Sequence, residues 1–265
     1  MADQGKKRGN KEHIVPPGLS LSMLQGKTAI ITGASRGIGK AIALTFARHG
    51  AFVGINYATQ KDKAEHVLHA IEDMNQEGVL LPGDVSTDAP RIKDTFLAEK
   101  SHIDILVNNA GIYKRGCFTD ISPSDWQRVL TVNLTGGYQM CKECIPYMDP
   151  GGRIIFISSQ LAFKGSTHGA DYAASKAGIL GLMRSLALEM ASHNITVNAI
   201  APGTIDTDII GFYTTEMRQK RIQEIPLGRL GIPQDIANVC LFLSSSLAGY
   251  ITGETIHVNG GLYIH

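Results

Sequence analysis

Short apolar, β-branched runs alternate with longer amphipathic stretches along most of the chain, and this alternation limits the possible folds more than any other feature. The runs that have the length of strands are 28–32, 52–57, 79–81, 103–107, 153–157, 195–200 and 255–258. The stretches predicted as helices are 39–49, 62–76, 89–100, 122–148, 172–190 and 233–245. Apolar strands separated by helices are typical of a parallel sheet that is covered on both faces. The pattern predicts one α/β domain with a doubly wound parallel sheet of about seven strands.

The composition is that of a globular protein without a pronounced charge. Of the 265 residues 43% are hydrophobic, which is enough for one large core. The 25 basic and 24 acidic residues leave a net charge of +1, so nothing attracts the chain generally to nucleic acid or to an anionic membrane surface. The longest apolar runs, such as Ile154–Ile157, are far too short to cross a membrane. We therefore expect no nucleic-acid partner and no membrane partner.

The first 24 residues differ in character from the rest. They are polar and basic, contain Pro16-Pro17-Gly18, and lack the apolar core of a signal peptide. We interpret residues 1–24 as a flexible basic extension and residues 25–265 as the domain. An arm that embraces an oligomer and a targeting segment are the alternatives for the extension.

The cysteines and histidines predict neither a disulfide framework nor a metal site. Cys141 and Cys144 form a C-x-x-C pair, but this pair lies within a predicted helix and no second ligand pair accompanies it. Packing therefore explains the two thiols better than zinc or redox chemistry, and a reducing, cytoplasmic location is expected. The nine histidines lack metal-ligand spacing, so His257 and His265 are interpreted as packing or surface residues.

A glycine-rich segment, Thr32–Gly39, follows the first predicted strand. Gly33 permits a sharp turn, Gly37 lets the backbone approach a pyrophosphate, and Gly39 allows helix and strand to pack closely. A pyrophosphate would then lie on the amides and positive dipole end of the following helix. Structural turns use glycine for the same reasons, but the position after the first strand of an alternating chain favours a dinucleotide site.

The end of the second predicted strand bears on the choice between NAD(H) and NADP(H). A carboxylate there would bind the ribose 2′-hydroxyl of NAD, whereas this chain has Asn56-Tyr57. Arg36, helped by Lys61 or Lys63, is placed to bind a 2′-phosphate; the alternative is that Arg36 is a solvated loop residue. We therefore favour NADP(H) over NAD(H).

Tyr172 and Lys176 are four residues apart in a predicted helix, thirteen residues or more after Ser159. That spacing places the phenol and the ammonium on one face. An adjacent ammonium favours the phenolate, so we expect it to lower the pKa of the tyrosine. With a serine hydroxyl to hold a carbonyl oxygen, the three side chains would form a proton-transfer site.

With these motifs the chain resembles the classical short-chain dehydrogenase/reductase family, and within it most closely the β-ketoacyl carrier-protein reductases. The resemblance runs from about Gly26 to Gly261, and it implies a single-domain Rossmann-type fold. It rests on Thr32–Gly39, Asp84-Val85, Asn108–Gly111, Asn133, Ser159, Tyr172 with Lys176, Pro202-Gly203, Ala248–Glu254 and His257–Gly261.

The resemblance implies four catalytic residues. Tyr172 would protonate the oxygen of a ketone as hydride reaches its carbon, and Lys176 would lower the pKa of Tyr172 and bind the nicotinamide ribose. Ser159 would orient the carbonyl, and Asn133 would hold a water that links Lys176 to solvent. Singly, Ser159 could end a strand, Asn133 could satisfy backbone groups, and Asp84 could cap a helix; their joint occurrence favours the functional interpretation.

The expected cofactor contacts come from the glycine loop, the second strand and the resemblance. They are Gly33, Ser35, Arg36, Gly37, Ile38, Gly39, Asn56, Tyr57, Asp84, Val85, Asn108, Ala110, Gly111, Tyr172, Lys176, Pro202, Gly203, Ile205 and Thr207.

The predicted function is NADP(H)-dependent, reversible reduction of a ketone to a secondary alcohol, with a 3-oxoacyl thioester of a carrier protein or of CoA as the favoured substrate. A dehydrogenase acting on another alcohol, sugar, steroid or carbonyl compound is the alternative, and a silent cofactor-binding relative is a further one. The substrate pocket should form from 113–115, 160–163, His168 and 204–227.

Two expectations concern partners. The positions at which the resemblance implies carrier-protein docking arginines fall near Pro150 and His193, so Arg218, Lys220 and Arg221 are the candidate substitutes. The helices 122–148 and 172–190 resemble those through which the family forms tetramers, so a homotetramer is expected.

Overall fold

Every predicted strand is present, and all of them belong to one parallel sheet. The computed structural model describes residues 22–264, so most of the predicted extension, and His265, lie outside the described residues. The strands are β1 (Thr28–Ile31), β2 (Phe52–Tyr57), β3 (Gly78–Pro82), β4 (Ile105–Asn108), β5 (Arg153–Ile157), β6 (Thr196–Pro202) and β7 (Thr255–Val258). Their order is β3-β2-β1-β4-β5-β6-β7, and each neighbouring pair is parallel. This confirms the predicted Rossmann-type doubly wound sheet and places the reversal of strand order between β1 and β4.

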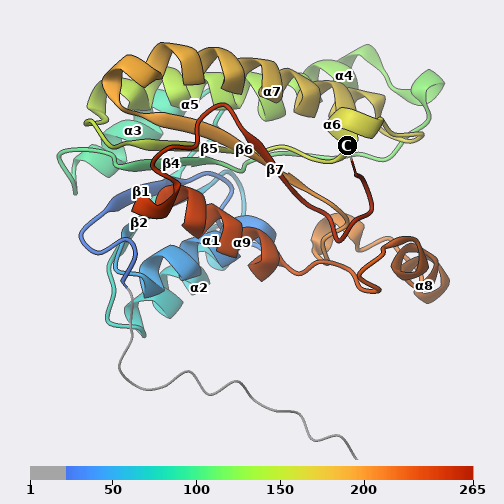
Figure 1. The fold of residues 1–265 in the computed structure, drawn as a ribbon, viewed down its shortest axis with the longest axis horizontal. Helices are drawn as coiled ribbons and strands as arrows, with labels where there is room; N and C mark the ends of the chain where they lie inside the picture. Colours follow the sequence, from blue (N-terminus) through green and yellow to red (C-terminus); the bar gives the residue numbers. More distant parts are fainter. Residues whose placement is uncertain (1–21, 265) are drawn as a thin grey trace, which may run out of the picture.

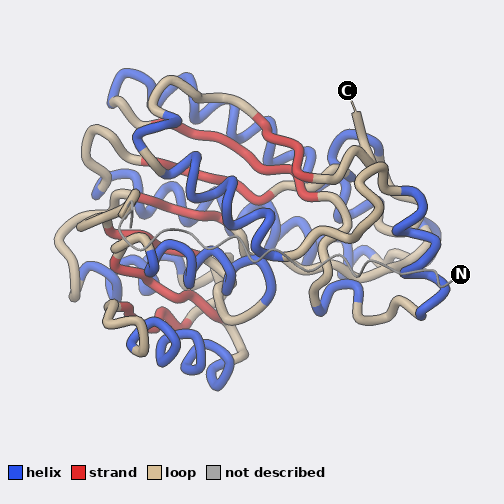
Figure 2. The backbone as a smooth tube through the Cα atoms, turned by 60° about the horizontal axis from the view of Figure 1, so that its bottom comes forward, coloured by secondary structure: helices blue, strands red, loops and turns tan. Residues whose placement is uncertain are grey.

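Helices cover both faces of the sheet. They are α1 (Gly37–Arg48), α2 (Lys61–Glu72), α3 (Ala89–Leu97), α4 (Pro123–Leu130), α5 (Gly136–Cys144), α6 (Leu161–Lys164), α7 (Ala170–Met190), α8 (Thr215–Glu224) and α9 (Pro233–Ser244). Figure 1 shows α1, α2 and α9 on one face, with α3, α5 and α7 on the other. The strands appear in Figure 2 as one twisted layer (red) between these helices.

The core consists of two apolar clusters that the sheet separates. Ala29 and Ile31 of β1 belong to the cluster with α1 and α9, whereas Ile30 belongs to the cluster with α3, α5 and α7. Successive side chains of a strand point to opposite faces, so a strand between two helical layers is apolar at most positions. This is why the central strands could be identified as continuous apolar runs. The buried polar residues of these strands, such as Thr28 and Asn198, form hydrogen bonds.

The predicted helical region 122–148 is helical but not uniform. Between α4 and α5 the chain forms a π-helical turn, Thr131–Thr135, and Asn133 lies at its centre. Such turns contain one residue more than an α-helical turn and often occur at functional sites. Here the turn directs the buried Asn133 side chain toward the carboxyl end of β4, where it bonds to the backbone of Ile112.

The structure differs from the prediction most clearly at the end of one helix, at the start of the domain and in one helix that was not predicted. The predicted helix 62–76 ends at Glu72, and Asn75 adopts a positive φ of 55° that stops it. Leu24 is buried in the core, so the domain begins before the predicted residue 25. α8 was not predicted as a helix; it lies beyond the carboxyl ends of the strands, apart from the two helical layers (Figure 1).

Within residues 22–264, no helix has both the length and the apolar character needed to span a membrane.

Candidate active site

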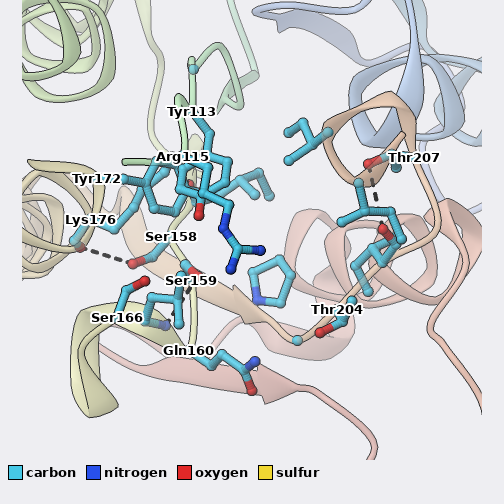
Figure 3. A pocket seen from close by; sticks show the side chains of 18 of the residues that line it. Tyr113, Arg115, Ser158, Ser159, Gln160, Ser166, Tyr172, Lys176, Thr204 and Thr207 are labelled. Atoms are coloured by element: carbon cyan, nitrogen blue, oxygen red, sulfur yellow. Dashed lines mark hydrogen bonds between the residues drawn. The ribbon is translucent and has the colours of Figure 1, made fainter. Parts of the chain in front are cut away.

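A cavity of about 780 Å³ lies at the carboxyl ends of β4, β5 and β6 (Figure 3). Ligands of open parallel sheets bind at this edge. Of the predicted site residues, those that line the cavity are Ile38, Gly111, Ser159, Tyr172, Lys176, Pro202, Gly203, Ile205 and Thr207. Those that lie outside its lining are Gly33, Ser35, Arg36, Gly37, Gly39, Asn56, Tyr57, Asp84, Val85, Asn108, Ala110 and Asn133.

Tyr172 and Lys176 lie on one face of α7, near its first residue, Ala170. The ring of Tyr172 meets that of Tyr113 edge-on, with the centroids 5.0 Å apart. Lys176 is buried, and its Nζ donates a hydrogen bond of 2.8 Å to the carbonyl of Ile157 at the end of β5. That Nζ lies 5.6 Å from the centroid of the Tyr172 ring. The predicted pairing of phenol and ammonium is therefore present in space.

The pKa of Tyr172 shifts in the direction opposite to the predicted one. Burial raises it to about 12, although a hydrogen bond with Ser159 acts to lower it. Burial also lowers the pKa of Lys176 to about 8. Loss of hydration disfavours the charged form of each group; for the phenol this cost exceeds the favourable effect expected from the ammonium. At neutral pH the phenol therefore holds its proton.

Ser159 is the second residue after β5 and is buried, with its Oγ accepting a 3.1 Å hydrogen bond from the amide of Leu161. The neighbouring Ser158 donates to the carbonyl of Lys176 at 2.9 Å (Figure 3). This bond ties the end of β5 to α7 and so sets the distance between Ser159 and Tyr172. The sequence does not indicate this role of Ser158, apart from its position next to Ser159.

Asn133 contacts the backbone rather than the cavity. Its Oδ1 accepts from the amide of Ile112 at 2.8 Å, and its Nδ2 donates to the carbonyl of Ile112 and to Ser175 Oγ. Ser175 in turn donates to the carbonyl of Tyr172 at 2.7 Å. These hydrogen bonds together link the π-helical turn to the turn of α7 that carries Tyr172. Ser175 was not predicted, because only the fold shows that it faces Asn133.

The glycine loop has the geometry that the spacing predicts. Gly33 and Gly37 adopt positive φ values of 62° and 54°, which favour glycine. At Gly39 a Cβ atom would clash with the carbonyl of Gly33, so glycine is required for the close packing of α1. The first turn of α1 has neither a side-chain cap nor an acidic residue, so its amides and dipole fit the pyrophosphate of a dinucleotide.

Arg36 lies in an ion pair with a residue that was not predicted to take part. Its Nη1 is 3.1 Å from Asp208 Oδ2, and the Nζ of Lys63 lies 3.6 Å from the same oxygen. Lys61 pairs instead with Glu65 of its own helix at 3.4 Å. Arg36 and Lys63 are therefore the two cations brought together beside the glycine loop.

The Asn56 side chain lies beneath the glycine loop and is buried. Its Oδ1 accepts from the amide of Gly33, and its Nδ2 donates to the carbonyls of Leu81 and Gly83. With both ends of the amide bound to backbone, Asn56 positions the loop, and we revise its predicted role as a cofactor contact accordingly. Tyr57 is likewise buried, within the core.

At the carboxyl ends of β3 and β4 the predicted residues differ in the bonds they make: those of Asp84 are local, whereas those of Asn108 and Asn109 reach distant segments. Asp84 Oδ1 accepts from the amide and hydroxyl of Ser86, and Val85 is buried. Asn108 Nδ2 contacts Cys141 Sγ at 3.3 Å. The next residue, Asn109, belongs to the predicted motif Asn108–Gly111; it lines the cavity and donates to the carbonyls of Thr32 and Gly33.

The substrate side of the cavity agrees in part with the predicted pocket. The predicted residues that line it are Tyr113, Arg115, Gln160, Leu161, His168, Thr204, Ile209, Ile210, Phe212, Tyr213 and Arg221. Lys114 lies outside and pairs with Asp125; Phe163 also lies outside, and its ring contacts that of His257 in a tilted arrangement with the centroids 4.5 Å apart. The second contact confirms His257 as a packing residue. The segment Lys164–Thr167 was missed and lines the cavity.

The C-x-x-C pair is part of the core. Cys141 and Cys144 are buried free thiols, and burial raises the pKa of Cys141 to about 12. This confirms the packing role. Within the described part of the chain no group of three or more His, Cys, Asp or Glu side chains is arranged to hold a metal ion.

Comparison with known sequences gives consistent matches over nearly the whole chain. The family model described as enoyl-(acyl carrier protein) reductase matches residues 33–263. The 3-oxoacyl-(acyl-carrier-protein) reductase FabG of Aquifex aeolicus is 43% identical over 255 residues, covering 91% of this chain and 98% of that protein. The FabG proteins of Staphylococcus aureus and Escherichia coli are 40% and 42% identical, each covering 91% of this chain and 100% and 98% of their own length.

Solved structures show the same architecture. A dehydrogenase/reductase from Sinorhizobium meliloti is 32% identical with a TM-score of 0.88, and the match covers 92% of this chain and 98% of that one. The angucycline C-6 ketoreductase LanV with bound NADP is 34% identical with a TM-score of 0.87, covering 91% and 96%. A Burkholderia cenocepacia short chain dehydrogenase in complex with NADP is 31% identical with a TM-score of 0.87, covering 91% and 99%.

Proposed function

Because this chain belongs to the short-chain dehydrogenase/reductase family, whose members act as oxidoreductases on CH–OH groups, we propose that it is an NADP(H)-dependent reductase of 3-oxoacyl thioesters. The observation that carries the proposal is the meeting of Ser159, Tyr172 and Lys176 in one cavity beside the glycine loop. The three come from two elements, β5 and α7, which Ser158 ties together.

Tyr172 is the proposed proton donor to the ketone oxygen. Its pKa of about 12 keeps the phenol protonated at neutral pH, so the group can give a proton as negative charge develops on the substrate oxygen. Ser159, which lines the same cavity as this phenol, is placed to donate to the same oxygen and to orient the carbonyl. Lys176 holds its place through the carbonyl of Ile157 and would restore the charge balance at Tyr172 after proton transfer.

The cofactor site is proposed along the glycine loop. NADP(H), when bound, supplies or accepts the hydride. The amides at the start of α1 would hold its pyrophosphate, and Pro202, Gly203, Ile205 and Thr207, which line the cavity, would face its nicotinamide end. Arg36 and Lys63 would bind the 2′-phosphate, because both already converge on one anionic oxygen, that of Asp208.

The thioester substrate is supported by the FabG relatives, whose names state 3-oxoacyl-(acyl-carrier-protein) reduction. A ketone other than a thioester is the alternative, supported by the ketoreductase and alcohol-dehydrogenase names among similar structures. Of the candidate docking cations, Arg218 pairs with Asp206 at 2.7 Å and Arg221 lines the cavity, which leaves Lys220 on the outer face.

We also propose a homotetramer and a cytoplasmic location. α7 exposes Leu188, 82% accessible, and Leu247 and Tyr250 near β7 are 71% and 104% accessible; packing against other copies would bury such side chains. The free buried thiols support a reducing compartment. Light scattering during size-exclusion chromatography tests the assembly, and a monomer at micromolar concentration would refute it.

The function is tested by following NADPH and NADH oxidation with acetoacetyl thioesters of pantetheine and carrier protein, a cyclic ketone and a crotonyl thioester. We expect turnover of acetoacetyl thioesters, preference for NADPH, and no reduction of the crotonyl double bond. Turnover of the cyclic ketone without turnover of any thioester would replace the proposed substrate with the alternative. Reduction of the crotonyl thioester alone would favour the reaction that the matching family model names.

A further inference from the structure

Three cationic side chains from separate segments line the substrate side of the cavity. Arg115 follows β4, Lys164 ends α6, and Arg221 lies on α8. Figure 3 shows Arg115 extending into the space that Tyr172 and Ser159 also face. Among the described residues that line the cavity there is no aspartate or glutamate. A ligand in this space therefore meets positive charge on several sides and no acidic side chain in the wall.

These charges are only partly neutralised by the protein. Arg221 pairs with Glu224 at 2.6 Å. Within residues 22–264, neither Arg115 nor Lys164 forms an ion pair, and Arg115 instead lies over the ring of Phe212 at 5.5 Å. Lys164 and Arg221 both line the cavity. Burial and the positive charge of Arg221 lower the pKa of Lys164, whereas the carboxylate of Glu224 acts to raise it. Like charges held close together at a concave surface attract an anion.

From this arrangement we propose that Arg115, Lys164 and Arg221 form a subsite for an anionic group, a carboxylate or a phosphate, at the end of the ketone substrate away from its reacting carbonyl. The inference rests on the proposed ketone reduction and specifies the class of ketone. Two chemical sources share this feature: a free keto acid and a thioester whose pantetheine arm ends in phosphate. Guanidinium groups bind both kinds of anion through paired hydrogen bonds.

The test uses two matched pairs of substrates with the full-length protein and NADPH. The first pair is 5-oxohexanoate and its uncharged ethyl ester; the second is acetoacetyl-4′-phosphopantetheine and acetoacetyl-pantetheine, which lacks the phosphate. For at least one pair we expect kcat/KM for the anionic member to exceed that of its neutral partner about tenfold, the value of one charge-assisted hydrogen bond. The pair that shows the preference identifies the source of the anion.

Charge-removing variants then assign the preference to the subsite. In Arg115→Gln, Lys164→Gln and Arg221→Gln, the ratio of kcat/KM between the anionic and the neutral substrate should fall toward one, whereas Arg115→Lys should retain part of it. Lys114→Gln and Lys220→Gln are matched controls, because each removes one positive charge from the residue next to a subsite residue without lining the cavity. These controls should keep the wild-type ratio.

The results separate failure of the inference from failure of the proposed function. Equal kcat/KM for both members of both pairs, or the same loss of preference in the controls as in the subsite variants, would overturn the anionic subsite while leaving ketone reduction intact. If no ketone of either pair is reduced with NADPH or NADH, the proposed function, ketone reduction, is itself refuted.

Discussion

The carboxylate of Asp208 lies 3.1 Å from the guanidinium of Arg36 and so occupies the position that the proposed function assigns to a cofactor phosphate. Lys63 lies 3.6 Å from the same oxygen. A ligand phosphate bound there must displace or share these contacts, so Asp208 is a competitor for the two cations.

The first prediction concerns this competition. Replacing Asp208 with Asn removes the competing charge, so the Kd of NADPH should fall by up to about fivefold, the value of an exposed ion pair, while that of NADH stays nearly constant. Asp206→Asn is the matched control, because Asp206 lies in the same loop but pairs with Arg218. Fluorescence titration measures both constants. An equal change for NADPH and NADH would contradict binding of the 2′-phosphate by Arg36 and Lys63.

The second prediction concerns the proton donor. Tyr172→Phe removes the phenol hydroxyl that Ser159 contacts, so kcat for ketone reduction should fall by about 10²–10⁴, as for loss of a general acid. The Kd of NADPH should stay within about twofold, since the ring and its packing on Tyr113 remain. Tyr138→Phe, on the exposed surface of α5, is the control and should retain activity. Full activity of Tyr172→Phe would contradict the role of Tyr172 as the proton donor.

The third prediction concerns the narrow space at Gly111. A Cβ atom there would lie 3.2 Å from Asn133 Oδ1, a tight contact, and 3.5 Å from Lys176 Nζ, an ordinary one, so Gly111→Ala should push the Asn133 side chain away and add a methyl group to the cavity wall beside Lys176. We expect the Kd of NADPH to rise about tenfold and kcat to fall, since an error of about 1 Å in positioning is costly.

Gly116→Ala controls for the change of residue type, because a Cβ atom at Gly116 meets nothing within 4 Å. If both variants bind NADPH equally, the close approach of Gly111 to Asn133 does not matter for the site.

The fourth prediction follows from the pKa of Lys176. The folded protein holds this pKa at about 8, below the ordinary 10.5, so between these values the unfolded chain binds more protons. The contribution of Lys176 to the free energy of unfolding should therefore rise with pH through this window, by at most roughly 1.4 kcal/mol per pH unit, and decline as pH falls toward 8.

Urea unfolding of the wild type and of Lys176→Met at pH 7.5, 8.5 and 9.5 isolates this contribution, since other titrating groups cancel in the difference. The range stops below pH 10, where unfolded tyrosines begin to ionise and Tyr172 would add an opposite trend. A difference that does not change with pH would mean that Lys176 keeps its ordinary pKa in the folded protein.

The sheet could be predicted from the sequence because its physical requirement is visible residue by residue. A strand covered on both faces must be apolar at successive positions, as in Thr28–Ile31, and a turn with positive φ needs glycine, as at Gly33 and Gly37. Tyr172 and Lys176 could be paired because helical spacing determines which side chains share a face.

Features that depend on contacts between distant segments could not be predicted in this way. α8 is strongly polar and buries no residue completely. It therefore lacks the regularly spaced apolar residues by which a helix is predicted from sequence. The role of Asn56 depends on Gly33, Leu81 and Gly83 meeting around it. The pKa of Tyr172 was predicted to be lowered, whereas it is raised. The sequence spacing shows that an ammonium is near the phenol, but it does not show that the phenol is buried away from water, and burial raises the pKa.

Because the π-helical turn Thr131–Thr135 contains one extra residue, the number of residues between α4 and α5 is constrained in this protein. Deleting one residue there would let the helix become regular, and the change would fall on the side chains of the turn itself and on how the turn joins α4 to α5. Asn133 would then leave the backbone of Ile112, or α5 would turn Met140 and Cys144 away from the core. Variation in length should therefore be tolerated in the surface loops of this chain but not in this turn.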